Sequence, residues 1–494
     1  MGWKETAEPV LTRMPTVARP EGHVPFKRKL TWTAGILVMY FFLTNVTLYG
    51  LQTGGTDFYG QFRSILAGAS GSILQLGIGP IVTASIVLQL LGGADLLGLD
   101  TENDPRDQVL YQGLQKLLVV VMCILTGAPM VFASPLLNAD PMVAQSLGIG
   151  QRGVEGLLFA QIFVGGILLL FMDEIVSKWG VGSGVGLFII AGVSQRLVGG
   201  LFSWSGLTAN STDGFLAVWI GIITGSTDLP GSPLTSEGLS AIFLGQGMIL
   251  AMITTVLIFV VVVYAESVRI EIPLSHARVK GARGKFPVKL IYASVLPMIL
   301  VRALQANLQF LGQILHSQWT GMPTWLGEYS DQGQVTEGLF WYLKPIQSPQ
   351  EWMWFAGATV TQDWWQVLAR IGVDLTFMIV GGAVFAIFWV ETTGMGPEAT
   401  AQQIQNSGMQ IPGFRRNPQV IEKVMERYIP QVTVIGGALV GLLAVMANML
   451  GTIGQVSGTG LLLTVSITYK LYEEIAEEQL MEMHPMMRQM FGSE

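Results

Sequence analysis

Residues 77–91 read GIGPIVTASIVLQLL, a hydrophobic helix whose start is interrupted by Gly77, Gly79 and Pro80. The preceding residues 57–69, DFYGQFRSILAGA, have the pattern of a short amphipathic helix framed by glycines. The helix at 57–69 is too short to cross a bilayer, which takes roughly 20 apolar residues. A membrane protein tolerates such a broken element only where the backbone lines a cavity enclosed by protein. The two stretches therefore predict a chain that surrounds a path through the membrane.

The composition is typical of a helical protein that crosses the membrane many times. Half of the 494 residues are hydrophobic, only 12% are charged, and the mean hydropathy is +0.51. The formal net charge is −7, which is acidic for a membrane protein. Because acidic excess keeps exposed loops hydrated in concentrated salt, it indicates a halophilic source.

The hydropathy pattern predicts ten membrane spans. They lie near residues 30–50, 73–92, 108–132, 155–173, 184–203, 241–265, 288–312, 370–391, 430–450 and 458–477. Lysine and arginine gather before the first span and in the loops 266–287 and 392–429, whereas loop 204–240 contains neither. Since basic loops mark the cytoplasmic side, we expect both termini in the cytoplasm. The tryptophan-rich loop 313–366 then lies outside, as an interfacial belt or, alternatively, a binding surface.

Signatures of catalysis are absent from the sequence, which contains no Walker A loop, HExxH motif or GxSxG elbow. The only cysteine, Cys123, and the scattered histidines do not have metal-ligand spacing, so we expect no enzyme, cofactor or metal site. Asp173, Glu174, Glu266 and Glu391 lie near predicted span ends and are interpreted as solvated or helix-capping groups. A proton relay would need carboxylates at mid-membrane depth, where the spans offer almost none.

Two hydrophobic pairs stand out within the spans. Ile78 and Val82 share one face of the second span, and Val185 and Ile189 share one face of the fifth, because residues four apart stack on a helix. Such pairs are ordinary core or lipid contacts unless another observation makes them part of a gate.

Longer strings in the chain resemble the SecY family, the channel subunits of the Sec protein translocon, in its archaeal form, which is similar to the eukaryotic α subunit. The resemblance extends from about residue 20 to the C-terminus. The strings that carry it are GIGPIVTASIVLQLLGG, YQGLQKLL, DEIVSKWGVGSGVGLFIIAGVSQ, VVVYAESVRIEIPLSHARVKGARGKFPVKLIY, IFWVETTGMGP and GTGLLLTVSITYKLYE.

The resemblance implies an all-α membrane fold. Ten transmembrane helices would form two pseudo-symmetric five-helix halves around a central hourglass pore, with a short plug helix at about 57–69. The implied divisions are a cytoplasmic segment 1–28, an N-terminal half 29–203, an external hinge loop 204–240, a C-terminal half 241–477 and a cytoplasmic tail 478–494.

The resemblance also assigns residues to four sites. The pore ring would consist of Ile78, Val82, Val185, Ile189, Ile299 and Leu463. The plug would include Phe58, Tyr59, Phe62, Arg63, Ile65 and Leu66. The lateral gate would carry Thr83, Asn307 and Thr126, the last at a position where relatives often have a larger polar side chain. Ribosome docking would use Arg278, Lys280, Arg415 and Arg416.

The implied function is a passive protein-conducting channel in the cell membrane. It would translocate secretory polypeptides, recognise signal sequences and release transmembrane segments sideways into lipid. The implied partners are SecE-type and Secβ-type small membrane subunits, the ribosome with its rRNA, and the signal-recognition-particle pathway. The alternatives are a secondary transporter with a broken-helix binding site and a structural scaffold. A transporter predicts ionisable or carbonyl-rich groups near the midplane, whereas the sequence predicts an apolar neck.

Overall fold

The computed structural model describes most of the chain. The described residues are 3–22, 24–52, 66–93, 97–99, 104–132, 137–204, 214–225, 235–245, 248–276, 283–291, 296–319, 321–330, 335–354, 362–393, 395–406, 409–410 and 418–483.

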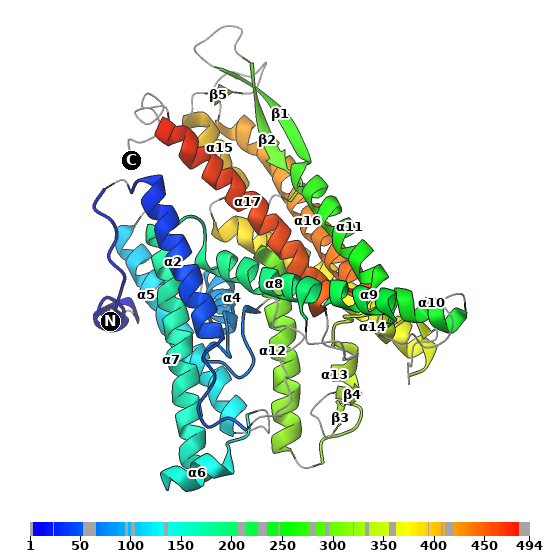
Figure 1. Cartoon of the computed structure of the whole chain (residues 1–494). Helices are drawn as coiled ribbons and strands as arrows, with labels where there is room; N and C mark the ends of the chain where they lie inside the picture. The colour runs from blue at the N-terminus through cyan, green and yellow to red at the C-terminus, as the bar shows by residue number, and fades with distance from the viewer. Residues whose placement is uncertain are drawn as a thin grey trace.

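Among the described residues, ten helices of 15 or more residues form the body of the molecule, in agreement with the predicted fold class (Figure 1). Seven are long and apolar enough to cross a membrane by length and composition: α5 (Pro105–Phe132), α7 (Gly150–Trp179), α8 (Gly184–Phe202), α11 (Ile249–Ser267), α12 (Leu296–Gln318), α14 (Trp364–Thr392) and α16 (Pro418–Leu450). The other three are α2 (Phe26–Thr44), α4 (Gly79–Gly93) and α17 (Gly458–Met483).

Helix α4 is short for a span, with 15 residues. At 1.5 Å per residue it rises roughly 22 Å, less than the roughly 30 Å of a bilayer core. The irregular segment 66–78 precedes it and is largely buried, so its backbone is enclosed by protein as the opening motif predicts.

Shorter elements connect these helices. The short helices are α1 (Trp3–Leu11), α6 (Pro141–Leu147), α9 (Phe215–Thr224), α10 (Ser236–Phe243), α13 (Leu339–Tyr342), α15 (Pro397–Asn406), η2 (Pro349–Glu351) and η4 (Ile453–Gln455). The strands are β1 (Arg269–His276), β2 (Arg283–Lys289), β3 (Glu328–Tyr329), β4 (Val335–Glu337) and β5 (Met409–Gln410).

The strands sit at opposite ends of the helical body. The β1–β2 hairpin, α15 and the C-terminal part of α17 lie at one end, and α6, α13 and the β3–β4 hairpin lie at the other (Figure 1). Strand β1 pairs antiparallel with both β2 and β5, with Ser275 opposite Gln410. The sheet therefore joins the two basic loops 266–287 and 392–429, which the sequence predicts only as separate segments.

Several predicted span boundaries differ from the helix ends by a few residues, and in two spans another element occupies part of the predicted range. The predicted span 241–265 is divided, because α10 ends at Phe243 and α11 begins at Ile249, after Met248 with a left-handed φ of 48°. The predicted span 288–312 begins later, at Leu296, because residues up to Lys289 belong to the hairpin. Short apolar runs do not distinguish strand from helix by periodicity alone.

The N-terminal segment folds back along the ends of α5 and α7. Lys4 pairs with Asp107 at 2.8 Å, and Lys116 donates to the carbonyl of Pro15. Further along, the indole of Trp179 donates to the carbonyl of Ala18 at 2.8 Å. Residues 3–22 are therefore attached to the first half of the molecule.

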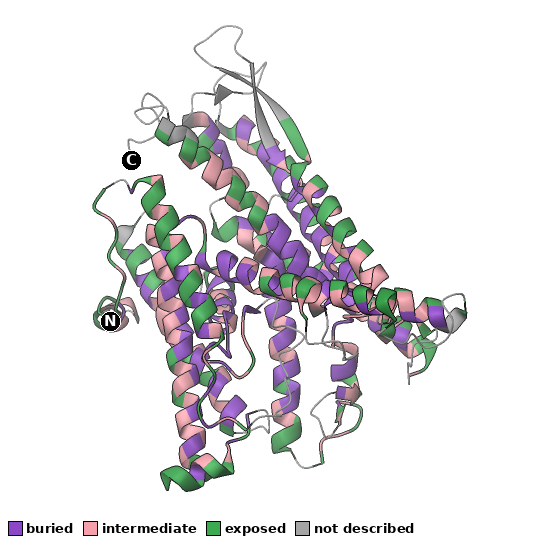
Figure 2. Cartoon of the chain, in the orientation of Figure 1, coloured by how far each residue is buried: buried purple, intermediate pink, exposed green. Residues whose placement is uncertain are grey.

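Buried residues concentrate in the middle of the molecule, around α8, α12 and α17 (Figure 2). The largest hydrophobic cluster draws side chains from both predicted halves. Many large apolar side chains are exposed on the outer faces of the long helices, including Phe259 and Val260 on α11. This distribution is that of a helical membrane protein, whose outer faces contact lipid.

Candidate functional site

The turn between residue 66 and α4 depends on a glycine at position 77. Gly77 has a φ of +55°, and a Cβ there would lie 2.1 Å from the carbonyl oxygen of Leu66. The same carbonyl accepts a hydrogen bond from the amide of Ile78 at 2.7 Å. Tyr40 of α2 donates its hydroxyl to the carbonyl of Ala67 at 2.8 Å. The last residues of the predicted plug are therefore attached both to the start of α4 and to α2.

The structure brings the six predicted ring residues into one hydrophobic cluster. They come from four helices or their first turns: Ile78 and Val82 at α4, Val185 and Ile189 on α8, Ile299 on α12, and Leu463 on α17. Ile78, Ile189 and Leu463 are 0% exposed, and Val185 is half-buried. These apolar side chains therefore pack together where the two predicted halves meet.

Asp173 positions the start of α8 and with it two of these residues. Its Oδ1 accepts the amide of Val185 at 2.9 Å, so the carboxylate caps the N-terminus of the helix. A Cβ on Gly184 would lie 2.5 Å from the same oxygen, which explains the glycine. The interpretation of Asp173 as a helix-capping group is confirmed.

The three predicted lateral-gate residues line one small cavity of about 10 Å³. Thr83 comes from α4, Thr126 from α5 and Asn307 from α12, and the rest of the lining, which includes Leu66, is apolar. The side-chain amide of Asn307 donates to the hydroxyl of Thr83 at 3.1 Å, while that hydroxyl donates to the carbonyl of Gly79 at 2.9 Å. A space of this size holds about one water molecule. The contact between α4 and α12 is therefore a narrow seam that one polar pair crosses.

Most of the predicted plug and the predicted docking residues lie outside the described residues. These are Phe58, Tyr59, Phe62, Arg63 and Ile65 of the plug, and Arg278, Lys280, Arg415 and Arg416 of the basic loops. The base of the hairpin is described, and Glu473 of α17 pairs there with Arg269 at 3.0 Å and with Lys289.

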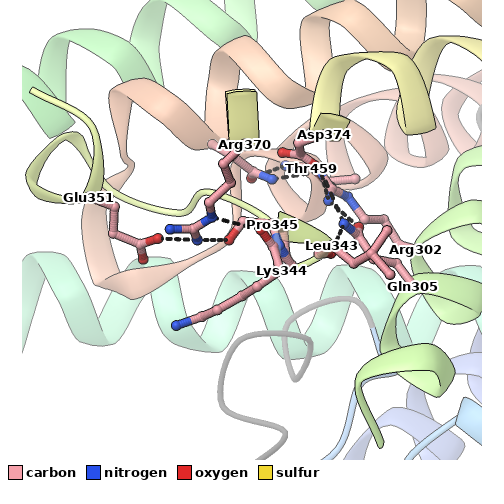
Figure 3. Close-up of polar contacts among 10 residues, drawn as sticks. Arg302, Gln305, Leu343, Lys344, Pro345, Glu351, Arg370, Asp374 and Thr459 are labelled. Carbon is pink, nitrogen blue, oxygen red and sulfur yellow. Dashed lines mark hydrogen bonds and ion pairs between the residues drawn. The ribbon is translucent and has the colours of Figure 1, made fainter. Parts of the chain in front are cut away.

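The sequence interpretation missed a buried polar cluster on α12 and α14. Asp374 and Arg302 are each 1% exposed, although the spans were expected to offer almost no mid-membrane carboxylates (Figure 3). The signal was present as Arg302, Gln305 and Gln309, which recur at helical spacing within a predicted span. Among the described residues, no group of histidine, cysteine or acidic side chains could hold a metal ion.

Comparison with known families gives two matches that together cover most of the chain. Residues 72–472 match the SecY family, and residues 38–71 match the family described as the plug domain of Sec61p. The second match includes the segment 57–69, which the sequence singles out as a short amphipathic helix.

Curated relatives match over nearly their full lengths. A protein translocase subunit SecY from Haloferax volcanii is 79% identical over 495 residues, covering 100% of both chains. One of the same name from Archaeoglobus fulgidus is 50% identical and covers 99% of this chain and 98% of its own. Similarity to a relative from a halophilic archaeon agrees with the acidic composition.

Solved structures agree with the sequence relatives. The structure described as "The structure of a protein conducting channel" has a TM-score of 0.77 and 38% identity, covering 97% of this chain and 98% of its own. The structure described as "Sec61 in the Canine ribosome-channel complex from the endoplasmic reticulum" has a TM-score of 0.75 and 36% identity, with the same coverage.

Proposed function

Because this chain belongs to the SecY family, we propose that it is a protein-conducting channel rather than an enzyme. In this proposal it moves secretory polypeptides across the membrane and releases transmembrane segments sideways into lipid. The observation that carries the proposal is the apolar cluster at the junction of α4, α8, α12 and α17, which would act as a closed constriction, with the seam beside it.

The constriction suits a channel that must seal without recognising a sequence. A narrow apolar neck dewets and blocks ions, because an ion loses its hydration there without compensating contacts. Aliphatic side chains such as Ile78, Ile189 and Leu463 make no directional bonds, so they can part around different polypeptides and close again. A selective ion channel would instead need ordered carbonyls or charged rings.

The seam between α4 and α12 suits sideways release. Transfer of Leu, Ile, Phe or Val to the centre of a membrane helix gains roughly 0.3 to 0.6 kcal/mol per residue. A segment that reaches an opening between Thr83 and Asn307 would therefore partition into lipid according to its hydrophobicity. The Asn307–Thr83 hydrogen bond is weak enough to be exchanged during such an opening, at about 1 kcal/mol.

We further propose that the hairpin end of the molecule faces the cytoplasm, with both termini there. Arg269 and Lys289 lie at this end, and the basic residues 278, 280, 415 and 416 follow strands that pair in one sheet. Basic residues favour the cytoplasmic side. The proposal keeps the divisions 1–28, 29–203, 204–240, 241–477 and 478–494, with α9 inside the hinge segment 204–240 and α10 extending past its end to Phe243.

The partners proposed for the channel follow from its family and, for the ribosome, also from its basic loops. The basic loops around Arg278, Lys280, Arg415 and Arg416 would bind phosphate-rich ribosomal RNA in a salt-dependent way. A solved relative is described as part of a ribosome-channel complex, which supports this choice. SecE-type and Secβ-type subunits would cover part of the exposed apolar faces, and the signal-recognition-particle pathway would deliver ribosomes. No nucleotide site is expected, so these partners would supply the driving force.

Crosslinking tests the channel directly. A photo-crosslinker at Ile78 or Val185 should capture a stalled secretory chain in membranes that contain the full complex. The matched control is the same group at Val260, which is 58% exposed on the outer face of α11 and should capture lipid. If Ile78 and Val185 also capture only lipid or small solutes, the channel proposal is wrong.

A further inference from the structure

Helix α12 carries a buried polar stripe beside the face that meets α4. Arg302, Gln305, Gln309 and Gln313 recur every three or four residues, and each is at most 5% exposed. Ile299, Ala303 and Asn307 occupy the adjoining face, where the ring and the seam lie. Polar side chains inside a membrane protein are costly unless they find partners, so the partners of this stripe indicate what it does.

The inner end of the stripe connects α12 to α14 and α17 (Figure 3). Arg302 donates through Nε to the hydroxyl of Thr459 at 3.1 Å and through Nη1 to Gln305 Oε1 at 2.6 Å. Its Nη1 lies 3.5 Å from Asp374 Oδ1, which also accepts from Gln305 at 3.2 Å. Asn448 of α16 holds Thr459 in turn, because its amide donates to that hydroxyl at 3.2 Å.

The outer end of the stripe holds the segment 339–345 between α12 and α14. Gln305 donates to the carbonyl of Leu343 and Gln309 to that of Phe340, both at 2.9 Å. From α14, Arg370 donates to the carbonyls of Lys344 and Pro345 at 3.1 Å each (Figure 3). One side of α12 is therefore hydrogen-bonded to its neighbours over about two turns, from Arg302 to Gln309.

The ion pair at the centre of this network is poorly suited to stabilise the fold. It is long and involves one oxygen, and within the described part of the chain Arg302 Nη2 and Asp374 Oδ2 have no hydrogen-bond partner. Buried pairs of this kind are often replaced by apolar side chains with no loss of stability, because desolvation offsets their attraction. What the network does provide is direction, since each hydrogen bond requires a defined orientation of α12, whereas the hydrophobic effect is not directional.

We infer that Arg302, Gln305, Asp374 and Thr459 form a brace that sets the resting position of α12, and through it the ring and the lateral gate. Ile299 lies one turn before Arg302, and Asn307 lies about one turn after it. A rotation of α12 would therefore displace a ring residue and a seam residue together. With the brace intact, α12, α14 and α17 move as one unit and the opening forms at α4. The inference rests on the proposed channel function and adds the residues that position its gate.

The double variant Arg302→Leu/Asp374→Leu, made in the full complex, tests whether the brace positions α12 or only stabilises the fold. Each single substitution leaves a buried charge without its partner and should lower thermal stability, whereas the double substitution should restore it. The resting ion conductance of the double variant should nevertheless stay above that of the unmodified channel. The increase should be on the order of tenfold if the closed state loses the free energy of one charged hydrogen bond. If the double variant is as stable and as ion-tight as the unmodified channel, the brace is wrong.

A second pair of variants tests the brace without removing a charge, in case the charge variants fold poorly. Thr459→Val removes the hydroxyl that receives Arg302 Nε, and Thr459→Ser retains it. Only Thr459→Val should raise the resting conductance and slow disulfide formation between cysteines introduced at Thr83 and Asn307. Equal behaviour of the two would contradict the brace.

Two controls show which proposal has failed. Glu351→Gln removes the charge that pairs with Arg370 at 2.6 Å outside the brace and should leave the resting conductance unchanged. Crosslinking of a stalled secretory chain at Val185 should persist in every variant. If the unmodified protein fails to capture the chain, the channel proposal fails; if it captures the chain and the double variant is ion-tight, the brace alone fails.

Discussion

Helix α12 is held very differently on its two sides. Toward α14 and α17, Arg302 and Gln305 connect it through buried hydrogen bonds to Asp374 and Thr459. Toward α4, it meets a cavity of about 10 Å³ lined largely by small side chains and crossed by the Asn307–Thr83 hydrogen bond. We expect α12 to separate from α4 rather than from α14 and α17, because breaking the contact with α4 costs less free energy.

The largest expected effect comes from leaving the fastened side with an unpaired charge. Asp374→Leu should destabilise the protein by about 3–5 kcal/mol, because Arg302 stays buried without its counter-charge. Thermal unfolding of the purified complex measures this. Thr376→Val on the exposed face of α14 is the matched control and should change little. A loss below about 1 kcal/mol in Asp374→Leu would mean that Arg302 finds water or another partner.

The contact of α12 with α4 can be perturbed at Gly77, in the turn that precedes α4. Gly77→Ala should cost about 3 kcal/mol, because the new Cβ meets the Leu66 carbonyl and the φ of +55° disfavours alanine. Gly148→Ala is the control, since its φ of +67° is similar and its Cβ would meet nothing within 4 Å. Chemical denaturation should then separate the two variants. Equal losses in both would show that backbone conformation alone decides the cost.

A smaller effect is expected within the seam itself. Asn307→Leu removes the hydrogen bond to Thr83 but leaves that hydroxyl bonded to Gly79, so the loss should be about 1 kcal/mol. The frequency of spontaneous openings in a planar bilayer should rise several-fold, with little change in melting temperature. Ser317→Ala near the end of α12 should change neither quantity. A large drop in stability would show that the seam contributes as much to the free energy of unfolding as the brace does.

The smallest effect is expected at the hairpin base, away from both sides of α12. Glu473→Gln breaks ion pairs with Arg269 and Lys289, whose side chains are 40% and 34% exposed, so the cost should stay below about 1 kcal/mol. This cost should shrink further as the salt concentration rises. Glu477→Gln, one turn along the same helix, removes an equal charge and corrects for the change in net charge. A loss that is independent of salt would contradict this account.

Much of the fold was predictable from the sequence because hydropathy reports membrane spans directly. The ten spans correspond to α2, α4, α5, α7, α8, α11, α12, α14, α16 and α17, and the break at Gly77–Pro80 marks the junction between the irregular segment and α4. The boundaries that failed lie near Met248 and Lys289, where a short helix and a strand adjoin a span. Apolar content alone does not distinguish these elements.

The apolar ring residues were easier to predict from the sequence than the buried polar cluster around Arg302 and Asp374. The pairs Ile78–Val82 and Val185–Ile189 were visible as hydrophobic residues four apart, and the family resemblance added Ile299 and Leu463. Their assembly in one cluster is a fact of the structure, while their role as a ring is our proposal. The Arg302–Asp374 pair was missed because 72 positions separate the two residues, and only the packing of α12 against α14 brings them within 3.5 Å.

The sequence by itself determined that this protein is a bundle of membrane helices with a broken element at Gly77–Pro80. The reason is that a bilayer selects apolar stretches of defined length and admits irregular backbone only inside protein. Only the tertiary structure decided which polar groups meet, since Asn307 contacts Thr83 across the seam while Arg302 contacts Asp374 and Thr459 behind it. Those contacts depend on how α12 packs against α4, α14 and α17, helices that are far from it in the sequence.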